Sequence, residues 1–360
     1  MLHPEMVRFF EGILENRTNE YRFAPEDLAS EEQAEAKKAK IRRKLLELLK
    51  IDAIEEAAGF RRFDGEDRVV SAPAPHVELL SIETCEGYRR ERWKMETLPG
   101  IYMPFFLLVP DRWNTDAEGT CFLAAHGHGP GKDSVAARRP FTHMYGYGDP
   151  KPGYGEILAK EGHLVLAPDM WGFGERRVSD TKPYGSNDCT TLSDAAEACG
   201  FTLLGLFVWD HMRAVDYLVS RPDCKNVAMI GFSGGGEQTI FTTALDGRIR
   251  AAYAGGYLHR YQGGMLYNHM CSCNFVPGLY RVMELSDVAG IAAPRPFLFE
   301  NGVHDGLNGN GGIVNVEKAA DEVRNIYRAY GAEERIWTNF WEGGHAYNGG
   351  KTLDFFAQYT

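Results

Sequence analysis

The sequence lacks several features that would point to membranes or nucleic acids. No run of about 18 apolar residues occurs, so we expect no segment to span a bilayer. Basic residues are in the minority, since 39 Lys and Arg stand against 50 Asp and Glu, a net charge of −11. Because phosphate groups are bound by basic surfaces, neither nucleic acid nor an anionic membrane is expected as a partner.

Cysteine is also scarce, and no secretory leader is visible. The seven cysteines are an odd number spread over 360 residues, which is not typical of a disulfide-stabilised fold. The first residues lack the charged-then-apolar pattern of a signal peptide. We therefore predict a reduced, cytoplasmic protein, although a secreted form with its signal removed would look the same. A hydrophobic content of 44% indicates a globular chain.

The beginning of the chain has a helical pattern that differs from the rest. Ser30 followed by Gln33 forms a capping box ahead of an apolar-periodic helix that we expect to end near Gly59. We therefore divide the chain into an N-terminal helical extension over residues 1–60 and a main domain over residues 61–360. No internal repeat or low-complexity block is evident.

The main domain alternates short apolar strands with helices. Residues 76–109 alternate as antiparallel strands do. Beyond them, strands are expected over residues 121–125, 163–167, 226–232, 251–254, 296–300 and 336–340, and helices near 154–161, 193–220, 234–246, 316–330 and 346–358. This order predicts an α/β fold with a doubly wound, mostly parallel sheet and helices on both faces. The long segments 129–153, 170–192 and 256–290 should be loops at the ligand-binding edge.

One strand-to-helix turn contains a serine between glycines. The sequence Gly-Phe-Ser-Gly-Gly at residues 231–235 follows an apolar run and precedes a helical segment. This is the pattern of a nucleophile elbow, in which a tight turn exposes the serine hydroxyl above the sheet. Ser233 is therefore the candidate nucleophile.

A serine needs a base to accept its proton and a carboxylate to orient that base. At such an elbow the acid and then the histidine follow further along the chain. Asp305 and His345 each come directly after a predicted strand, so both should reach the same edge of the sheet as Ser233. No histidine follows His345, which leaves it as the only base in that order.

Negative charge on a reacting carbonyl oxygen would require N–H donors. The N–H of Gly234 should be one, and the loop after the strand at 121–125 should supply the other. His128 is the preferred second donor there, with Gly127 as its competitor. His126 and His128 could suggest a metal site, but no Asp or Glu with the usual spacing stands nearby, so we expect none.

A second group of metal-binding residue types occurs at residues 269–273. His269, Cys271 and Cys273 are close in sequence, yet no C-x-x-C or H-E-x-x-H pattern accompanies them. We interpret the cysteines as packed side chains beside the site, and we predict neither metal nor cofactor.

Taken together, these motifs resemble the α/β-hydrolase superfamily, and within it the dienelactone-hydrolase-like and acetyl-xylan-esterase-like families. The resemblance covers residues 75–360 and includes the motifs at residues 126–129, 168–169, 221–223, 231–235, 294–296 and 343–345. It implies a cofactor-free serine esterase that forms an acyl-enzyme. Dienelactone hydrolases carry cysteine in place of Ser233, and the helical first 60 residues are not part of the basic fold. The alternatives are a serine peptidase of the same fold and a catalytically silent binding module.

Tyrosines in the predicted loops suggest the kind of substrate. Tyr145, Tyr147, Tyr257 and Tyr261 are interspersed with glycine and polar residues, unlike the continuous apolar surface that a long acyl chain requires. A tyrosine ring with its hydroxyl suits a sugar. We therefore predict a small-molecule or carbohydrate ester, with acetyl as the acyl group. Whether copies of the chain form a homo-oligomer stays open.

Overall fold

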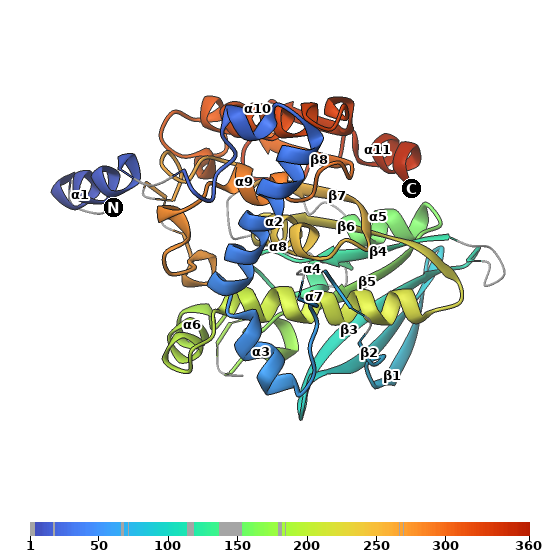
Figure 1. Ribbon diagram of the computed structural model, residues 1–360. Helices are drawn as coiled ribbons and strands as arrows, with labels where there is room; N and C mark the ends of the chain where they lie inside the picture. The colour runs from blue at the N-terminus through green and yellow to red at the C-terminus, as the bar shows by residue number, and fades with distance from the viewer. Residues whose placement is uncertain are drawn as a thin grey trace.

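A nine-stranded sheet crosses the centre of the molecule (Figure 1). The structure is a computed structural model, and it describes residues 4–16, 19–65, 68–70, 72–113, 119–136, 153–178, 182–183, 185–265, 267–268 and 270–360. The strands are β1 (Val77–Cys85), β2 (Tyr88–Leu98), β3 (Ile101–Pro110), β4 (Gly119–Ala125), β5 (Leu164–Pro168), β6 (Cys224–Phe232), β7 (Ile249–Gly255), β8 (Phe297–Gly302) and β9 (Ile336–Trp341). Their order in the sheet is β1-β2-β3-β5-β4-β6-β7-β8-β9.

Strand direction divides the sheet into two parts. The strands from β5 through β9 pair in parallel, whereas β1, β2 and β3 pair antiparallel with one another and with β5. This is the arrangement that the sequence predicts. Because β6, β8 and β9 run in parallel, their carboxyl ends lie at one edge of the sheet.

Helices cover both faces of the sheet. They are α1 (Pro4–Glu15), α2 (Glu31–Leu48), α3 (Ile51–Ala58), α4 (Lys132–Val135), α5 (Tyr154–Lys160), α6 (Cys189–Ala198), α7 (Leu203–Ser220), α8 (Gly234–Leu245), α9 (Leu285–Gly290), α10 (Ile313–Arg328) and α11 (Thr352–Tyr359). Short 3₁₀ turns are η1 (Pro25–Leu28), η2 (Gly174–Arg176), η3 (Ser272–Asn274), η4 (Leu279–Arg281), η5 (Gly306–Asn308) and η6 (Glu333–Arg335).

Successive side chains along each strand point to opposite faces of the sheet, so one apolar core forms on each face. In β4, Cys121 and Leu123 belong to one core, whereas Phe122 and Ala124 belong to the other. The first core also receives side chains from α2, α3, α7, α8, α9 and α10, and the second from α5 and α11. All four β4 side chains are fully buried, as expected for a strand covered on both sides.

Three predicted helices differ from those in the structure. The helix expected from the Ser30 cap to near Gly59 is two helices, α2 and α3, because Lys50 between them has φ 60°, in the left-handed region. The single helix expected over 193–220 is two helices, α6 and α7, because Gly200 has φ +84° and Thr202 caps a new helix by accepting from the N–H of Gly205. The helix expected to begin at 346 begins at Thr352, since the residues before it form a turn.

No single helix in the described ranges has the length and apolar character to cross a bilayer. Only the pair α6 and α7 meets those criteria together, and the two helices are bent by 97° where they meet.

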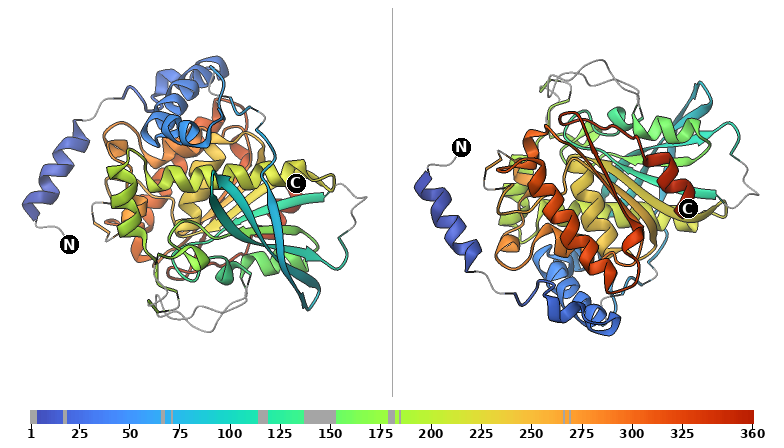
Figure 2. Two further views of the ribbon diagram at one scale, coloured as in Figure 1. Left: turned by 90° about the horizontal axis from the view of Figure 1, so that it is seen from below. Right: turned by 90° about the horizontal axis from the view of Figure 1, so that it is seen from above.

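The N-terminal segment combines a detached helix with closely packed ones. Helix α1 stands away from the rest of the molecule in both views of Figure 2. Helix α2 begins at the predicted cap, where the Ser30 side chain accepts from the N–H of Gln33, and it contributes Ile41 and Leu45 to the larger core. The division at residue 60 stays a prediction, and α2 shares its core with the main domain.

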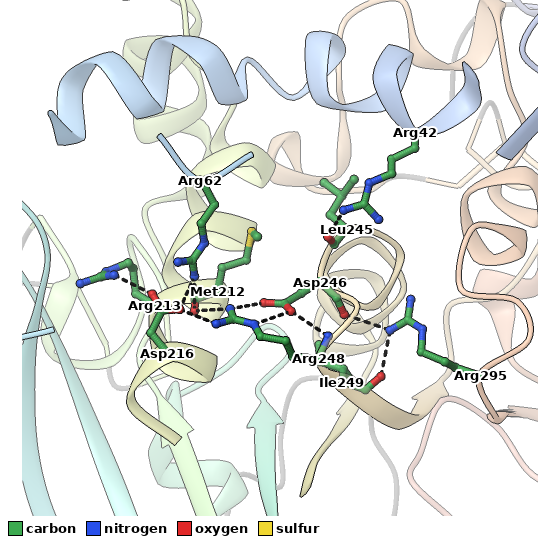
Figure 3. Close-up of polar contacts among 10 residues, drawn as sticks. All are labelled: Arg42, Arg62, Met212, Arg213, Asp216, Leu245, Asp246, Arg248, Ile249 and Arg295. Carbon is green, nitrogen blue, oxygen red and sulfur yellow. Dashed lines mark hydrogen bonds and ion pairs between the residues drawn. The ribbon is translucent and has the colours of Figure 1, made fainter. Parts of the chain in front are cut away.

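Two arginines, one on α2 and one shortly after α3, connect the first part of the chain to the centre of the fold (Figure 3). Arg42, on α2, donates to the carbonyl of Leu245 at 2.5 Å. Arg62 is fully buried and donates to the Met212 carbonyl at 2.8 Å and to the Asp216 carboxylate at 2.6 Å. These contacts hold α2 against the end of α8 and the residues after α3 against α7.

Candidate active site

Ser233 occupies a strained turn between β6 and α8. Its backbone has φ 59° and ψ −125°, a conformation that residues with a side chain rarely adopt. The chain on either side is tightly packed, because a Cβ on Gly231 would lie 2.1 Å from the Gly235 carbonyl oxygen. A Cβ on Gly235 would likewise lie 2.1 Å from the Ala125 carbonyl oxygen. The turn therefore has the form of a nucleophile elbow and requires glycine at both positions.

Ser233, His345 and Asp305 form one hydrogen-bonded chain. The Ser233 hydroxyl lies 2.8 Å from Nε2 of His345, and Nδ1 of the same ring lies 2.7 Å from Oδ2 of Asp305. His345 is 6% exposed and Asp305 is 4% exposed. This geometry allows the ring to accept the hydroxyl proton on one side while it donates to the carboxylate on the other.

Local contacts fix the orientation of the Asp305 carboxylate. Asp305 follows β8 and precedes η5, where its Oδ1 accepts from the N–H of Leu307 at 2.8 Å. Its other oxygen is thereby left for His345. An Asx-type turn, which is a structural role for a loop aspartate, coexists here with the contact to the histidine.

Glu300 holds the loop that carries His345, and the sequence analysis missed it. This fully buried residue of β8 accepts from the Tyr253 hydroxyl at 2.6 Å and from the N–H groups of Asn348 and Gly349 at 2.7 and 3.0 Å. Asn339, in β9, donates to the same carboxylate at 2.8 Å. A charged residue inside an otherwise apolar strand was the available signal, because such groups are buried only with partners.

The loop after β4 lies against the Ser233 turn, as predicted for oxyanion donors. A Cβ on Gly127 would lie 2.8 Å from the Phe232 carbonyl oxygen and 3.4 Å from the Gly234 nitrogen. His126 anchors this loop, since its Nε2 accepts from the N–H of Met170 at 3.0 Å. Burial lowers the pKa of His126. Gly234 begins α8, where a backbone N–H has no acceptor within the helix and is available to an anion.

Next to this loop lies a buried ion-pair network. Asp169 forms an ion pair with Lys132, which also contacts Glu175 at 2.5 Å. Burial alone would raise the pKa of the Glu175 carboxyl, but the hydrogen bond from Arg92 and the charge of Lys132 lower it to about 2. Asp169 is therefore occupied by structural contacts in this network.

Two of the four tyrosines predicted to contact substrate are buried in the structure. Tyr257 and Tyr261 are 2% and 1% exposed, and the Tyr257 hydroxyl donates to Glu237 at 2.7 Å. The prediction that these two side chains form a substrate surface is therefore wrong for this structure, because they pack inside the fold. Tyr145 and Tyr147 lie outside the described residues.

The cysteines of the segment at residues 269–273 have distant neighbours. Cys271 and Cys273 lie beside Cys189, at the start of α6, and beside His128. His269 lies outside the described residues. The sequence alone does not show that these residues are close together, since Cys189 and His128 are far from the pair along the chain.

Comparison with known proteins identifies relatives of the chain. The Bacillus subtilis (strain 168) protein named "Putative hydrolase YtaP" is 28% identical over 285 residues, which are 72% of this chain and 85% of that protein. The "Acetyl esterase Axe7A" of Xylanibacter ruminicola is 35% identical over 91 residues, 22% of this chain and 21% of that protein.

A similar solved structure comes from Bacteroides fragilis and is described as a "putative acetyl xylan esterase". It superposes with a TM-score of 0.74 at 19% identity and covers 100% of this chain and 90% of its own. At that identity the match establishes the α/β-hydrolase fold, which the sequence predicted. The finer resemblance to dienelactone hydrolases stays a prediction. The family model described as "Abhydrolase family" matches residues 68–339, and the chain therefore belongs to the abhydrolase family.

Proposed function

We propose that this protein is a serine esterase that cleaves short-acyl esters, with acetyl groups on a carbohydrate as the preferred substrate. The observation that carries the proposal is the hydrogen-bonded chain from Ser233 through His345 to Asp305, with the serine at a strained elbow. Neither a metal nor a cofactor takes part in the steps that follow.

The first half of the reaction transfers the acyl group to the enzyme. The Ser233 oxygen attacks the ester carbonyl carbon while Nε2 of His345 accepts the hydroxyl proton. Asp305 keeps the ring in the tautomer with its hydrogen on Nδ1 and stabilises the imidazolium that forms. His345 then donates its Nε2 proton to the leaving alcohol oxygen, and the acyl group remains on Ser233.

The second half repeats the same proton transfers with water. His345 accepts a proton from water, the hydroxide oxygen attacks the acyl carbon, and the serine oxygen leaves with the proton returned to it. In both halves the carbonyl oxygen becomes an oxyanion. The N–H of Gly234 and one N–H from Gly127 or His128 are the proposed donors, because these segments lie against each other.

The acyl group and the alcohol are proposed from the relatives. One is named an acetyl esterase and a similar fold is described as an acetyl xylan esterase. These names support an acetylated carbohydrate over a long-chain lipid or a peptide. The buried position of Tyr257 and Tyr261 leaves the sugar-binding side chains unassigned.

Covalent labelling tests the nucleophile directly. A fluorophosphonate probe should modify wild-type protein once, and peptide mapping should place the adduct on Ser233. The Ser233→Ala variant should be folded and unlabelled, with kcat lowered at least about 10³-fold. Folded wild-type protein that reacts neither with the probe nor with any ester would favour the silent binding module instead.

A substrate panel tests the specificity. We expect kcat/KM to fall from acetate through butyrate to octanoate esters of one alcohol, and an acetylated xylo-oligosaccharide to be cleaved efficiently. A peptide amide is the control for the peptidase alternative. Faster cleavage of octanoate than of acetate, or efficient peptide cleavage, would contradict the proposed specificity while leaving the labelling result intact.

A further inference from the structure

Three cysteines and one histidine converge beside the candidate active site. Cys189 comes from the start of α6, Cys271 and Cys273 come from the segment around η3, and His128 follows β4. Their ligand atoms, one Sγ from each cysteine and a ring nitrogen of the histidine, all lie within 4.8 Å of one another. Cys189 and Cys273 are buried, and His128 and Cys271 are half-buried.

The spacing of these atoms matches a tetrahedral metal site. Zn–S bonds of about 2.3 Å and Zn–N bonds of about 2.0–2.1 Å would put two sulfurs about 3.8 Å apart and a sulfur about 3.6 Å from the nitrogen. The Nε2 atom of His128 lies 3.2 Å from Sγ of Cys273 and 3.9 Å from Sγ of Cys189. Closing the four atoms around an ion therefore requires shifts of only a fraction of an ångström for these pairs.

The chemistry of the four side chains also favours a shared cation. Three thiols lie beside one imidazole, and thiolate and imidazole are ligands that Zn²⁺ prefers. Without a cation, three deprotonated sulfurs this close together would repel one another, whereas a divalent ion offsets most of their charge.

We propose that Cys189, Cys271, Cys273 and His128 form a zinc site. Three thiolates and one imidazole are a ligand set typical of tetrahedral Zn²⁺, and four protein ligands leave no position open for water. Zinc binding would release the protons of the thiols, and the ion would be structural rather than a reactant. The earlier prediction that these cysteines are only packed side chains is replaced by this proposal.

The location gives the site a structural consequence for catalysis. A Cβ on Gly234 would lie 3.1 Å from Nδ1 of His128, so the ring packs directly on the residue after the nucleophile. A metal on Nε2 would leave the ring hydrogen on Nδ1, the nitrogen that faces Gly234. The site would therefore tie α6 and the segment around η3 to the loop that carries a proposed oxyanion donor.

Metal analysis of purified protein tests the proposal. Protein expressed in zinc-supplemented medium and purified on a tag that does not bind metals should contain about one zinc per chain. Cys189→Ser and Cys273→Ser should each lose that zinc, while Cys199→Ser, which changes an exposed cysteine outside the cluster, should retain it. The Ser233→Ala variant should also retain it, which separates this result from the proposed catalytic role.

A second measurement is independent of how well the variants fold. Wild-type protein stripped by a chelator under reducing conditions should bind Co²⁺ and show thiolate-to-cobalt charge-transfer absorption in the near ultraviolet, and Zn²⁺ should displace it. The bound metal should also shield three thiols from a thiol reagent, counted against the seven in the sequence.

Three outcomes would overturn the zinc site. The first is folded, fully reduced wild-type protein that binds neither Zn²⁺ nor Co²⁺. The second is metal that stays bound when both Cys189 and Cys273 are replaced, since the ion would then sit elsewhere. The third is a disulfide between Cys189 and either Cys271 or Cys273 in the native peptide map, which would assign the cluster to redox chemistry.

Discussion

At the scale of single residues, the backbone of Ser233 stores strain that a glycine would relieve. With φ at 59° the Cβ of residue 233 is in an unfavourable position, which only a residue without a side chain avoids. We expect Ser233→Gly to raise the free energy of unfolding by about 1 kcal/mol over Ser233→Ala, because the alanine keeps the strained Cβ. Urea unfolding of the two inactive variants measures the difference. Equal midpoints would show that the turn is not strained.

Asp305 provides a second test at this scale. In Asp305→Asn the amide oxygen can still accept from the N–H of Leu307, so the loop should keep its shape. The amide nitrogen would then face Nδ1 of His345 and favour the wrong ring tautomer, which should lower kcat by about 10³- to 10⁴-fold. Steady-state kinetics with circular dichroism as the folding control checks this. A variant with near wild-type kcat would mean that another carboxylate orients His345.

The sequence located the candidate site residues by their order along the chain but could not define their surroundings. Ser233, Asp305 and His345 each follow a recognisable apolar strand, so the parallel sheet brings them to one edge. Tyr257 and Tyr261 show the limit of this reasoning, because composition alone does not say whether a loop aromatic faces solvent or packs inward.

At the scale of elements, α8 is held at both ends. Its first turn follows Ser233, and its last carbonyls are bound by two arginines. Arg42 donates to the carbonyls of Ala244 and Leu245 at 3.1 and 2.5 Å, and Arg295 donates to the Thr243 carbonyl. Cations at a helix C-terminus satisfy unpaired carbonyls and oppose the helix dipole. The N-terminal segment therefore stabilises the helix that begins at the candidate nucleophile.

Removing the Arg42 contact should destabilise the fold. Arg42→Met keeps much of the apolar stem and leaves two carbonyls of α8 without this donor. We expect the free energy of unfolding to fall by about 1–3 kcal/mol. Lys40→Met is the matched control on the same helix, since Lys40 forms an exposed ion pair with Glu20. Such pairs contribute about 0–1 kcal/mol. Equal unfolding midpoints for the two variants would exclude a special role for Arg42.

Glu300 joins two elements through one buried carboxylate. Glu300→Gln should lower both stability and kcat, because an NH₂ group would replace one of the two accepting oxygens and face N–H donors there, which loosens the loop of His345. We expect kcat to fall about 10-fold or more with KM little changed, since Glu300 has no proposed contact with substrate. A variant that loses stability but keeps wild-type kcat would show that the loop position does not depend on this carboxylate.

Element boundaries were predicted less well than element types. The break between α6 and α7 depends on the positive φ of Gly200. The apolar pattern of a helix continues on both sides of this glycine, so the pattern alone does not reveal the break. The late start of α11 follows from contacts with Glu300 in β8, whose carboxylate binds the N–H groups of Asn348 and Gly349 just before the helix. Both misses arise where a tertiary contact or a single backbone angle overrides the local pattern.

At the scale of the whole molecule, buried neutral histidines couple stability to pH. Burial lowers the pKa of His211 and of His259 to about 4, from the usual 6.5. The unfolded chain therefore binds more protons than the folded chain between these values. Each neutral ring contributes stability that is fully present above pH 6.5 and is lost as the pH falls toward 4.

Acidification should accordingly lower the free energy of unfolding, and protonation of His211 should account for part of this decrease. Between pH 6.5 and 4, each of the two histidines can lower the free energy of unfolding by an amount on the order of 3 kcal/mol. We expect His211→Gln, which retains a donor toward Gln238, to be less sensitive to pH than wild type. Urea midpoints at pH 7.5 and 5.0 measure this for both proteins. Identical pH dependence would show that His211 does not titrate as described.

The sheet order has a consequence for how the protein is made. During synthesis the elbow emerges on β6 well before β8 brings Asp305 and β9 brings His345. A nascent chain that folds early thus holds a helix start and a serine with no proton acceptor, so we expect that this serine cannot yet be acylated by an ester. In the proposed mechanism the serine becomes reactive only when β8 and β9 join the edge of the sheet, so we expect esterase activity to appear only after the last part of the chain has been synthesised.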